Sequence, residues 1–347
     1  FVPLFHFFKF HFDLLYFRMA AKKYVDVMKM FLKLEKGPKN FSSIVNTCRL
    51  VKAEEGNVSV EFEVDDRMVN HFGTLHGGCS ATMVDVITTG ALVATPRGMP
   101  GVSVDLHMTY LAAAKLGDTV QLDAEVIRSG KSMAFTKASL YRKPEMTLIA
   151  TGLHTKAFPA HAKIRKDVLD GLTRSMSRLV FQRAAQALTA PGVNPVYYER
   201  MNRFFAMDHE DKTFTGLVWN AEITDVQELK LSAEFTVDKH KIQHFGTLHG
   251  GCSATMVDCL TCAAVIVATG RPAVSVNLNM TYLNPAPLGS LVRLDAEVVK
   301  HGRSLAYTRA QLIRVEDGVE IACAKHTLAF SSKVYVRDAD DKEYKLR

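Results

Sequence analysis

The apolar and polar positions of the chain follow two distinct periods. Four segments alternate apolar and polar side chains, at the period of two that is typical of half-buried β-strands: 57–64, 102–111, 119–127 and 132–142. Between the first two of them, residues 77–94 are apolar on nearly every side of a helix, and such a helix is expected to be buried. One long helix beside mostly consecutive strands predicts an α+β architecture, with an antiparallel sheet packed on the helix.

The same pattern then repeats with many identical residues. The segment HFGTLHGGCSATMVD at residues 71–85 recurs letter for letter at residues 244–258. Further matches follow in the same order, such as VSVDLHMTYL from Val102 against VSVNLNMTYL from Val274, with a single residue deleted between the two series. Ordered matches of this length indicate a duplicated domain.

The duplication divides the chain into parts with different roles. We predict an N-terminal extension (1–27), a first domain (28–158), a helical linker (159–197), a second domain (198–333) and a charged C-terminal tail (334–347). The linker has helical spacing, and it either packs on the domains or is a solvated spacer. A chain of 347 residues is long enough for two domains that each bury a core.

Composition and charge narrow the class of function. The chain is 48% hydrophobic with a formal net charge of +7, which suits a globular protein with anionic partners. No basic stripe with interleaved aromatic residues is present, so nucleic acid is not expected as a partner. Charged residues interrupt the Phe-rich segment 1–18, so stable membrane insertion is not expected, although this segment could be an anchor or a targeting extension. Six cysteines without a secretory signal predict reduced thiols and an intracellular location, in the cytoplasm or a mitochondrion.

The predicted helix begins with two glycines that follow a histidine. The first N–H groups of a helix have no intrahelical acceptor, and the helix dipole makes the potential positive there. Glycine lets a ligand approach the backbone closely, so the N–H of Gly77 could receive a carbonyl oxygen. A simple helix start after a turn is the alternative. His76 either takes part in catalysis or holds this loop by hydrogen bonds.

Asp85 interrupts the most apolar part of this helix, where a carboxylate without partners is costly to bury. Its recurrence as Asp258 favours a functional role over that of a buried structural aspartate. Asp85 lies roughly 12 Å from Gly77 along the helix axis, so one helix cannot supply both groups to one carbonyl. Two copies related by a pseudo-twofold axis would instead bring Gly77 to Asp258 and Gly250 to Asp85.

These residues resemble those of the hotdog-fold acyl-CoA thioesterases. The resemblance covers both copies and rests on the patterns N-x5-HGG-x6-D, GVSVD, TY, G-K-[ST]-x-A-[FY]-T and HT. It implies two tandem hotdog domains, each an antiparallel sheet wrapped on a long central helix, which form an internal pseudo-dimer. It also implies hydrolysis of acyl-CoA without a cofactor or a bound metal. Medium or long fatty acyl chains are the expected substrates, and small aryl-acetyl thioesters are the alternative.

The resemblance further implies two catalytic sites, each built from both copies. In the first, Asn70 and the Gly77 N–H polarise the thioester carbonyl, and Asp258 and Ser275 orient and activate water. The equivalent positions of the second site are Gln243, His249, Gly250, Asp85 and Ser103. Gln243 stands where the family has Asn and is one methylene longer, so the two sites could be unequal.

Coenzyme A carries phosphate groups, so basic residues are expected around it. The residues that we expect there are Asp105, Tyr110, Arg128, Gly130, Lys131 and Lys156 in the first copy, and Tyr282, Lys300, Gly302 and Arg303 in the second. An ordinary surface role is the alternative for the basic ones. Cys259 and Cys262 form a lone CxxC, and we interpret them as buried helical thiols because no further zinc ligands or redox context accompany them.

Two other classes of function stay open. A hotdog hydratase or dehydratase would use the same helix N–H but a catalytic histidine with an acid, whereas the aspartate of HGG-x6-D favours hydrolysis. A non-catalytic acyl-CoA sensor would have lost its catalytic residues, and Gln243 suggests this for one site only. Because hotdog domains pair, the chain should contain one internal dimer and could dimerise further into a four-domain assembly.

Overall fold

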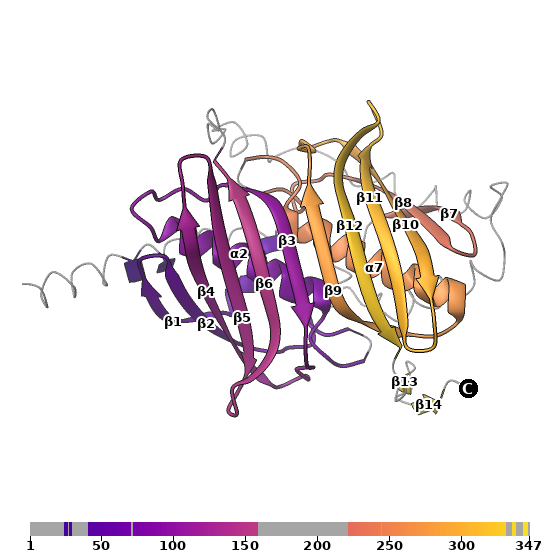
Figure 1. Ribbon diagram of the computed structural model, residues 1–347, viewed down its shortest axis with the longest axis horizontal. Coiled ribbons are helices and arrows are strands. Elements are labelled where there is room, and N and C mark those ends of the chain that lie inside the picture. Colours follow the sequence, from indigo (N-terminus) through magenta and orange to yellow (C-terminus); the bar gives the residue numbers. More distant parts are fainter. Residues whose placement is uncertain are drawn as a thin grey trace, which may run out of the picture.

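The computed structural model describes residues 24–26, 28–29, 41–70, 72–158, 221–243, 245–330, 335–337 and 343–345. The predicted linker lies outside these residues, as does the predicted N-terminal extension apart from 24–26. The described residues form two similar halves that lie side by side and share one sheet (Figure 1).

Each half has one long helix and six strands. The first half consists of η1 (Phe41–Thr47), β1 (Arg49–Glu54), β2 (Asn57–Glu63), α2 (Gly77–Val93), β3 (Val102–Tyr110), β4 (Thr119–Ser129), β5 (Met133–Arg142) and β6 (Thr147–Ala157). The second half consists of β7 (Glu222–Val226), β8 (Lys230–Thr236), α7 (Gly250–Thr269), β9 (Ala273–Tyr282), β10 (Leu291–His301), β11 (Leu305–Arg314) and β12 (Val319–Phe330). In the predicted C-terminal tail, β13 (Tyr335–Arg337) pairs with β14 (Glu343–Lys345).

The helix and the strands predicted by hydrophobic period correspond to α2 and to β2, β3, β4 and β5. The order of the sheet is β1-β2-β4-β5-β6-β3-β9-β12-β11-β10-β8-β7, and all neighbours are antiparallel. The two halves join where β3 pairs with β9. His107 and Asn279 face each other in that pair, and they occupy equivalent positions in the two copies. A pseudo-twofold axis therefore passes through this seam.

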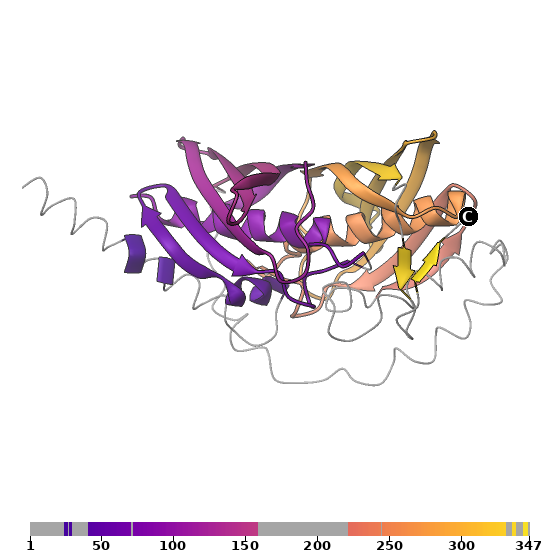
Figure 2. The same ribbon diagram turned by 90° about the horizontal axis from the view of Figure 1, so that it is seen from below.

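The sheet curves around α2 and α7, whose N-terminal halves meet at the centre of the molecule (Figure 2). The equivalent residues Thr82 and Thr255 touch there, with 3.3 Å between their hydroxyl oxygens. A Cβ atom on Gly78 would lie only 2.7 Å from the Cα of Thr255, and one on Gly251 would lie 2.9 Å from the Cα of Thr82. Only glycine allows the helices to cross so closely, and this crossing brings the start of each helix to the middle of the other.

The core lies between the two helices and the sheet. Helix α2 is buried on nearly all sides, and the strands bury alternate side chains such as Val120 and Leu122 of β4. Helix α7 has the length and composition of a membrane span, but most of it is buried inside the protein. Removing a large core side chain would cost about 2–5 kcal/mol, so the positions of both helices are well fixed.

Candidate active site

The loop before α2 holds the first glycine of the helix in a defined direction. His76 is the N-cap residue, and its Nδ1 accepts the Gly78 N–H at 3.0 Å. The hydroxyl of Tyr110 donates to the Gly77 carbonyl at 2.8 Å. The described residues supply no acceptor for the Gly77 N–H itself, so this group can donate to a ligand. This contact is of the loop-holding kind that we expect for His76.

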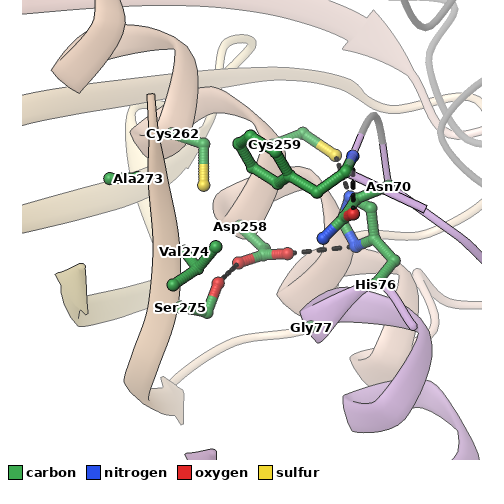
Figure 3. A pocket seen from close by; sticks show the side chains of 10 residues that line it. Asn70, His76, Gly77, Asp258, Cys259, Cys262, Ala273, Val274 and Ser275 are labelled. Carbon is green, nitrogen blue, oxygen red and sulfur yellow. Dashed lines mark hydrogen bonds and ion pairs between the residues drawn. The ribbon is translucent and has the colours of Figure 1, made fainter. Parts of the chain in front are cut away.

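Asp258 of the other copy meets this helix start. Its Oδ2 accepts the Gly78 N–H at 2.9 Å, and its Oδ1 accepts the Ser275 hydroxyl at 2.6 Å. A Cβ atom on Gly77 would lie 3.2 Å from Asp258 Oδ2 and 3.0 Å from Ser275 Oγ. The predicted meeting of Gly77 with Asp258 across the two copies is therefore found in the structure (Figure 3).

Asn70 borders the same space. Its side-chain oxygen accepts the Phe72 N–H at 3.0 Å, the Thr74 N–H at 3.3 Å and the Thr74 hydroxyl at 3.1 Å. Because these donors surround the oxygen, the amide N–H₂ is the part of Asn70 that can donate to a ligand. The pocket seen in Figure 3 is lined by both copies, namely by Asn70, Phe72, His76, Gly77, Asp258, Cys259, Cys262, Ala273, Val274 and Ser275.

Asp258 and His76, the ionisable groups at the centre of the pocket, shift each other's pKa. Burial raises the pKa of Asp258, but its contacts with His76, His326 and Ser275 outweigh burial and hold the pKa well below the ordinary value. Burial lowers the pKa of His76, yet Cys259 and Asp258 more than compensate and raise it well above the ordinary value. His76 Nδ1 lies 3.1 Å from Asp258 Oδ2. This nitrogen accepts the Gly78 N–H when the ring is neutral and donates to Asp258 when the ring is protonated.

The reciprocal site repeats this geometry. Asp85 Oδ2 accepts the Gly251 N–H at 2.9 Å, and the hydroxyl of Tyr282 donates to the Gly250 carbonyl at 2.7 Å. A Cβ atom on Gly250 would lie 3.1 Å from Asp85 Oδ2 and 3.0 Å from Ser103 Oγ. His249 is the N-cap residue, and its Nδ1 accepts the Gly251 N–H at 3.0 Å. The second predicted site is therefore also assembled from both copies.

The residues around the carboxylate of the reciprocal site differ from those of the first. The Lys156 ammonium lies 3.2 Å from Asp85 Oδ1 and donates to Thr89 Oγ1 at 2.7 Å, and this lysine is only 3% exposed. Burial raises the pKa of Asp85, but Lys156 and His249 outweigh it and hold the pKa well below the ordinary value. The prediction that Lys156 contacts coenzyme A is thus wrong, because the side chain points into the protein. The equivalent residue in the second copy is Leu328.

The loop of the reciprocal site also differs. Gln243 Nε2 donates to Thr247 Oγ1 at 3.0 Å, whereas Asn70 receives a hydrogen bond from the equivalent Thr74. At Gln243 the amide nitrogen, and not the amide oxygen, therefore bonds to the loop. The two sites share the backbone geometry at the helix start and the carboxylate opposite it. They differ at the positions of Asn70 and Gln243, and at those of Lys156 and Leu328.

Three further residues expected around coenzyme A have other contacts. The hydroxyls of Tyr110 and Tyr282 hold the glycine carbonyls at the two helix starts. Asp105 lies in the seam between the copies, where its Oδ2 accepts the Thr281 hydroxyl at 3.3 Å. These polar groups therefore have partners within the protein, and their contact with coenzyme A stays a prediction.

The other expected coenzyme A residues lie at the ends of two hairpins. Gly130 and Gly302 close the β4–β5 and β10–β11 turns, and the basic side chains beside them are exposed, namely Arg128, Lys131, Lys300 and Arg303. In the second copy, Ala329 pairs with Leu305 of the hairpin and with Val274 next to Ser275. The β10–β11 hairpin therefore accompanies the Asp258 site, and by the same pairing the β4–β5 hairpin accompanies the Asp85 site.

Several residues that line or support the pocket were not predicted. Cys259 is buried, as expected for a helical thiol, but its sulfur lies 3.7 Å from His76 Nε2 and both it and Cys262 line the pocket. Arg271 donates to the Arg303 carbonyl at 3.0 Å and covers the Phe330 ring at 3.8 Å. The signal for Cys262 was its position four residues after Asp258, which places both side chains on the same face of α7.

A family model and several known proteins match this chain. The model of the thioesterase superfamily matches residues 72–149 and 245–321, one region in each copy. Human acyl-coenzyme A thioesterase 13 is 47% identical over 118 residues, which cover 34% of this chain and 84% of the relative. The mouse protein of the same name is 40% identical over 131 residues, which cover 38% and 91%. The tesB protein of Mycobacterium avium subs paratuberculosis shares the fold alone, at 11% identity and a TM-score of 0.54 over 84% of this chain and all of that one.

Proposed function

The chain belongs to the thioesterase superfamily, and we propose that it hydrolyses medium- or long-chain fatty acyl-CoA to a free fatty acid and coenzyme A. The observation that carries this proposal is the convergence of the Gly77 N–H with Asp258 and Ser275 in one pocket. The names of the human and mouse relatives support coenzyme A thioesters as the substrate class. The apolar wall formed by Phe72, Ala273 and Val274 supports an aliphatic acyl group.

The proposed reaction uses water and groups of the protein only. The thioester carbonyl oxygen accepts hydrogen bonds from the Gly77 N–H and the Asn70 amide. Asp258 takes a proton from a water molecule whose oxygen attacks the carbonyl carbon, and Ser275 orients the carboxylate. The tetrahedral intermediate then breaks its carbon–sulfur bond, and the coenzyme A thiolate takes the proton back from Asp258. The products are the acid and the thiol, so all atoms balance.

The contacts of Asp258 hold its pKa below the ordinary value, so stabilisation of the oxyanion is expected to contribute beside the carboxylate. Removing one oxyanion-hole donor typically costs about 10²–10³ in kcat. The Asp258 site has Asn70 as a second donor, whereas Gln243 of the Asp85 site bonds to Thr247. Lys156 further withdraws basicity from Asp85. We therefore expect the Asp258 site to carry most of the turnover.

Coenzyme A would place its phosphates at the hairpin that accompanies each site. For the Asp258 site this is the β10–β11 hairpin, where Lys300, Arg303 and Arg271 provide positive charge. Ion pairs between exposed basic side chains and phosphates are screened by salt, with a Debye length of about 8 Å at physiological ionic strength. KM should therefore rise with salt while kcat changes little.

The His76–Asp258 contact favours one second candidate. A histidine beside a carboxylate at a helix start is also the pair that a hotdog hydratase would use on an enoyl-CoA. Hydration of an enoyl-CoA would preserve the thioester bond, whereas hydrolysis releases a thiol. Measuring thiol release and loss of the enoyl chromophore on the same substrate separates the two reactions.

The test is thiol release by the purified chain from acyl-CoAs of increasing length. Asp258→Asn should remove most of the activity, Asp85→Asn should remove a smaller part, and the double variant should lose about 10²–10⁴-fold, the usual contribution of acid–base catalysis. Asn keeps the shape of each carboxylate and serves as a matched change at both sites. Full activity in both single variants and the double variant would exclude the carboxylate mechanism. Binding of acyl-CoA without thiol release would instead identify a sensor.

A further inference from the structure

Two positions beside the carboxylates of Asp85 and Asp258 carry different residues in the two copies. In the first copy these positions hold a cation: the Lys156 ammonium contacts Asp85 Oδ1 at 3.2 Å, Thr89 Oγ1 at 2.7 Å and Ser103 Oγ at 3.4 Å. All four side chains are at most half-exposed, and Lys156 is 3% exposed. The protein thus builds a cation site out of oxygen atoms next to one catalytic carboxylate.

In the second copy, the lysine is replaced by Leu328 and the threonine by Cys262. Leu328 is fully buried and brings no charge. A carboxylate oxygen of Asp258, the Cys262 sulfur and a ring nitrogen of His326 then lie within 4.8 Å of one another. The second copy has therefore exchanged a built-in ammonium for a thiol while keeping the carboxylate and the histidine.

The hydrogen bonds of His326 determine which ring nitrogen faces this cluster with a lone pair. The Thr261 hydroxyl donates to the Val257 carbonyl at 2.6 Å, so its oxygen accepts the hydrogen on His326 Nδ1 at 2.7 Å. His326 Nε2 therefore carries a lone pair, and it is buried without a hydrogen-bond partner. It lies 3.3 Å from Asp258 Oδ1, which is also an acceptor.

Two acceptors that face each other in a buried space repel unless a cation or a shared proton lies between them. The first copy avoids this conflict. There, His154 Nε2 has the Ser103 hydroxyl at 3.0 Å and the Lys156 ammonium nearby. In the second copy, the Ser275 hydroxyl binds Asp258 at 2.6 Å instead, so no described side chain donates to His326 Nε2. This nitrogen is the second, independent sign of a ligand at the cluster.

We propose that Asp258, Cys262 and His326 form a binding site for a divalent cation of the zinc class. Carboxylate, thiolate and neutral imidazole are the ligands that zinc takes in proteins, at about 2.0–2.3 Å each. Those bond lengths place tetrahedral ligands about 3.5 Å apart, so the side chains need to move by about 1 Å to close on the metal. Thr261 and Ser275 already orient the imidazole and the carboxylate from behind.

The position of the cluster suggests how the cation would enter and what it would do. Cys262 is half-buried and lines the pocket together with Asn70 and Gly77, so the fourth coordination position faces the pocket. Asp258 belongs both to this cluster and to the proposed hydrolytic site. A cation on its Oδ1 would lower the basicity of the carboxylate that should accept a proton from water, so the metal would inhibit this site. This last consequence rests on the proposed function, whereas metal binding does not.

Cobalt(II) is the probe of choice, because a cobalt–thiolate bond gives a charge-transfer absorption that other ligands do not. Cobalt titrated into the chelator-treated full chain should give this band with one cobalt per chain. Cys262→Thr should abolish the band, and the change is structurally mild because Thr89 occupies the equivalent position. Leu328→Lys should abolish it too, because the ammonium would fill the site. Cys323→Ser, which changes a half-buried cysteine of β12 outside the pocket, should leave the band unchanged.

Absence of the band in the unmodified chain, or its persistence in Cys262→Thr, would overturn the proposal. The effect on catalysis is measured separately, with zinc added to the two carboxylate variants. Zinc should inhibit thiol release by Asp85→Asn, which keeps the Asp258 site, and leave the residual activity of Asp258→Asn unchanged. Equal inhibition of both variants would refute the inhibitory role. If no variant releases thiol, the proposed function fails while the cobalt band still decides the metal site.

Discussion

Replacing Lys156 by Met tests whether the buried ammonium stabilises the first copy. Met keeps the length of the side chain and removes the charge, so Asp85 loses its contact at 3.2 Å and Thr89 loses its donor at 2.7 Å. Asp85 keeps the Gly251 N–H at 2.9 Å, and the Ser103 hydroxyl at 3.3 Å can turn to it from His154 Nε2. The variant therefore leaves a buried carboxylate that is partly, but not fully, compensated.

The size of the effect follows from this loss. Removing one partner of a buried ion pair costs about 3–5 kcal/mol, because it leaves the other charge unpaired. The two donors that Asp85 keeps place the expected loss near the lower end, at about 3 kcal/mol. A typical domain has only about 5–15 kcal/mol of stability, so the change should be plain in a urea unfolding curve of the full chain.

The control is Leu328→Met at the equivalent position of the second copy. It conserves volume and should cost less than about 1.5 kcal/mol. Asp85→Asn combined with Lys156→Met completes a double-mutant cycle, in which the two changes should show a coupling free energy of about 2 kcal/mol. A loss below about 1 kcal/mol for Lys156→Met, or no coupling with Asp85→Asn, would refute the view that this ion pair stabilises the fold.

Three further predictions concern the centre of the molecule. Gly78→Ala should cost about 1–3 kcal/mol in urea unfolding, because its Cβ would lie 2.7 Å from the Cα of Thr255, whereas Gly302→Ala has 3.9 Å to its nearest atom and should cost less. Ser275→Ala should lower kcat about tenfold with little change in KM, since its hydroxyl holds only the carboxylate; a change confined to KM would contradict this role. The pKa of Asp258 is lower in the folded chain than the unfolded value near 3.9, so this group stabilises the fold above that pH and the contribution is lost as the pH falls further. The melting temperature should therefore fall less between pH 6 and 3 in Asp258→Asn than in the unmodified chain.

The fold and the cross-copy sites were accessible from the sequence because each rests on spacing. The period of two gave the central strands, and the repeat gave the second half. The distance from Gly77 to Asp85 excluded a site on one helix and required the other copy. These arguments depend on backbone geometry, which varies little between proteins.

The surroundings of each carboxylate depend on side-chain directions, and here the sequence arguments were incomplete. Lys156 was placed near coenzyme A because its positive charge suits the phosphate groups. The period of two along a strand predicts instead that Lys156 is buried. It lies two residues after the buried His154, so both side chains face the same side of β6. Cys262 shares the helix face of Asp258 by the same kind of argument. In both cases the period was present, but residue type was given more weight.

The cross-copy assembly changes how substitutions in a duplicated chain act. Each site takes its helix start from one copy and its carboxylate from the other, so a change within one copy falls into different sites according to its position. Gln243 and Leu328 both belong to the second copy, yet Gln243 alters the Asp85 site and Leu328 alters the Asp258 site. A protein built of two identical subunits could not separate these changes, because symmetry would place both in every site. The fused chain can therefore keep one site with Asn70 and the proposed metal ligand Asp258 beside another with a built-in cation, and neither copy alone supplies both a helix start and the carboxylate opposite it.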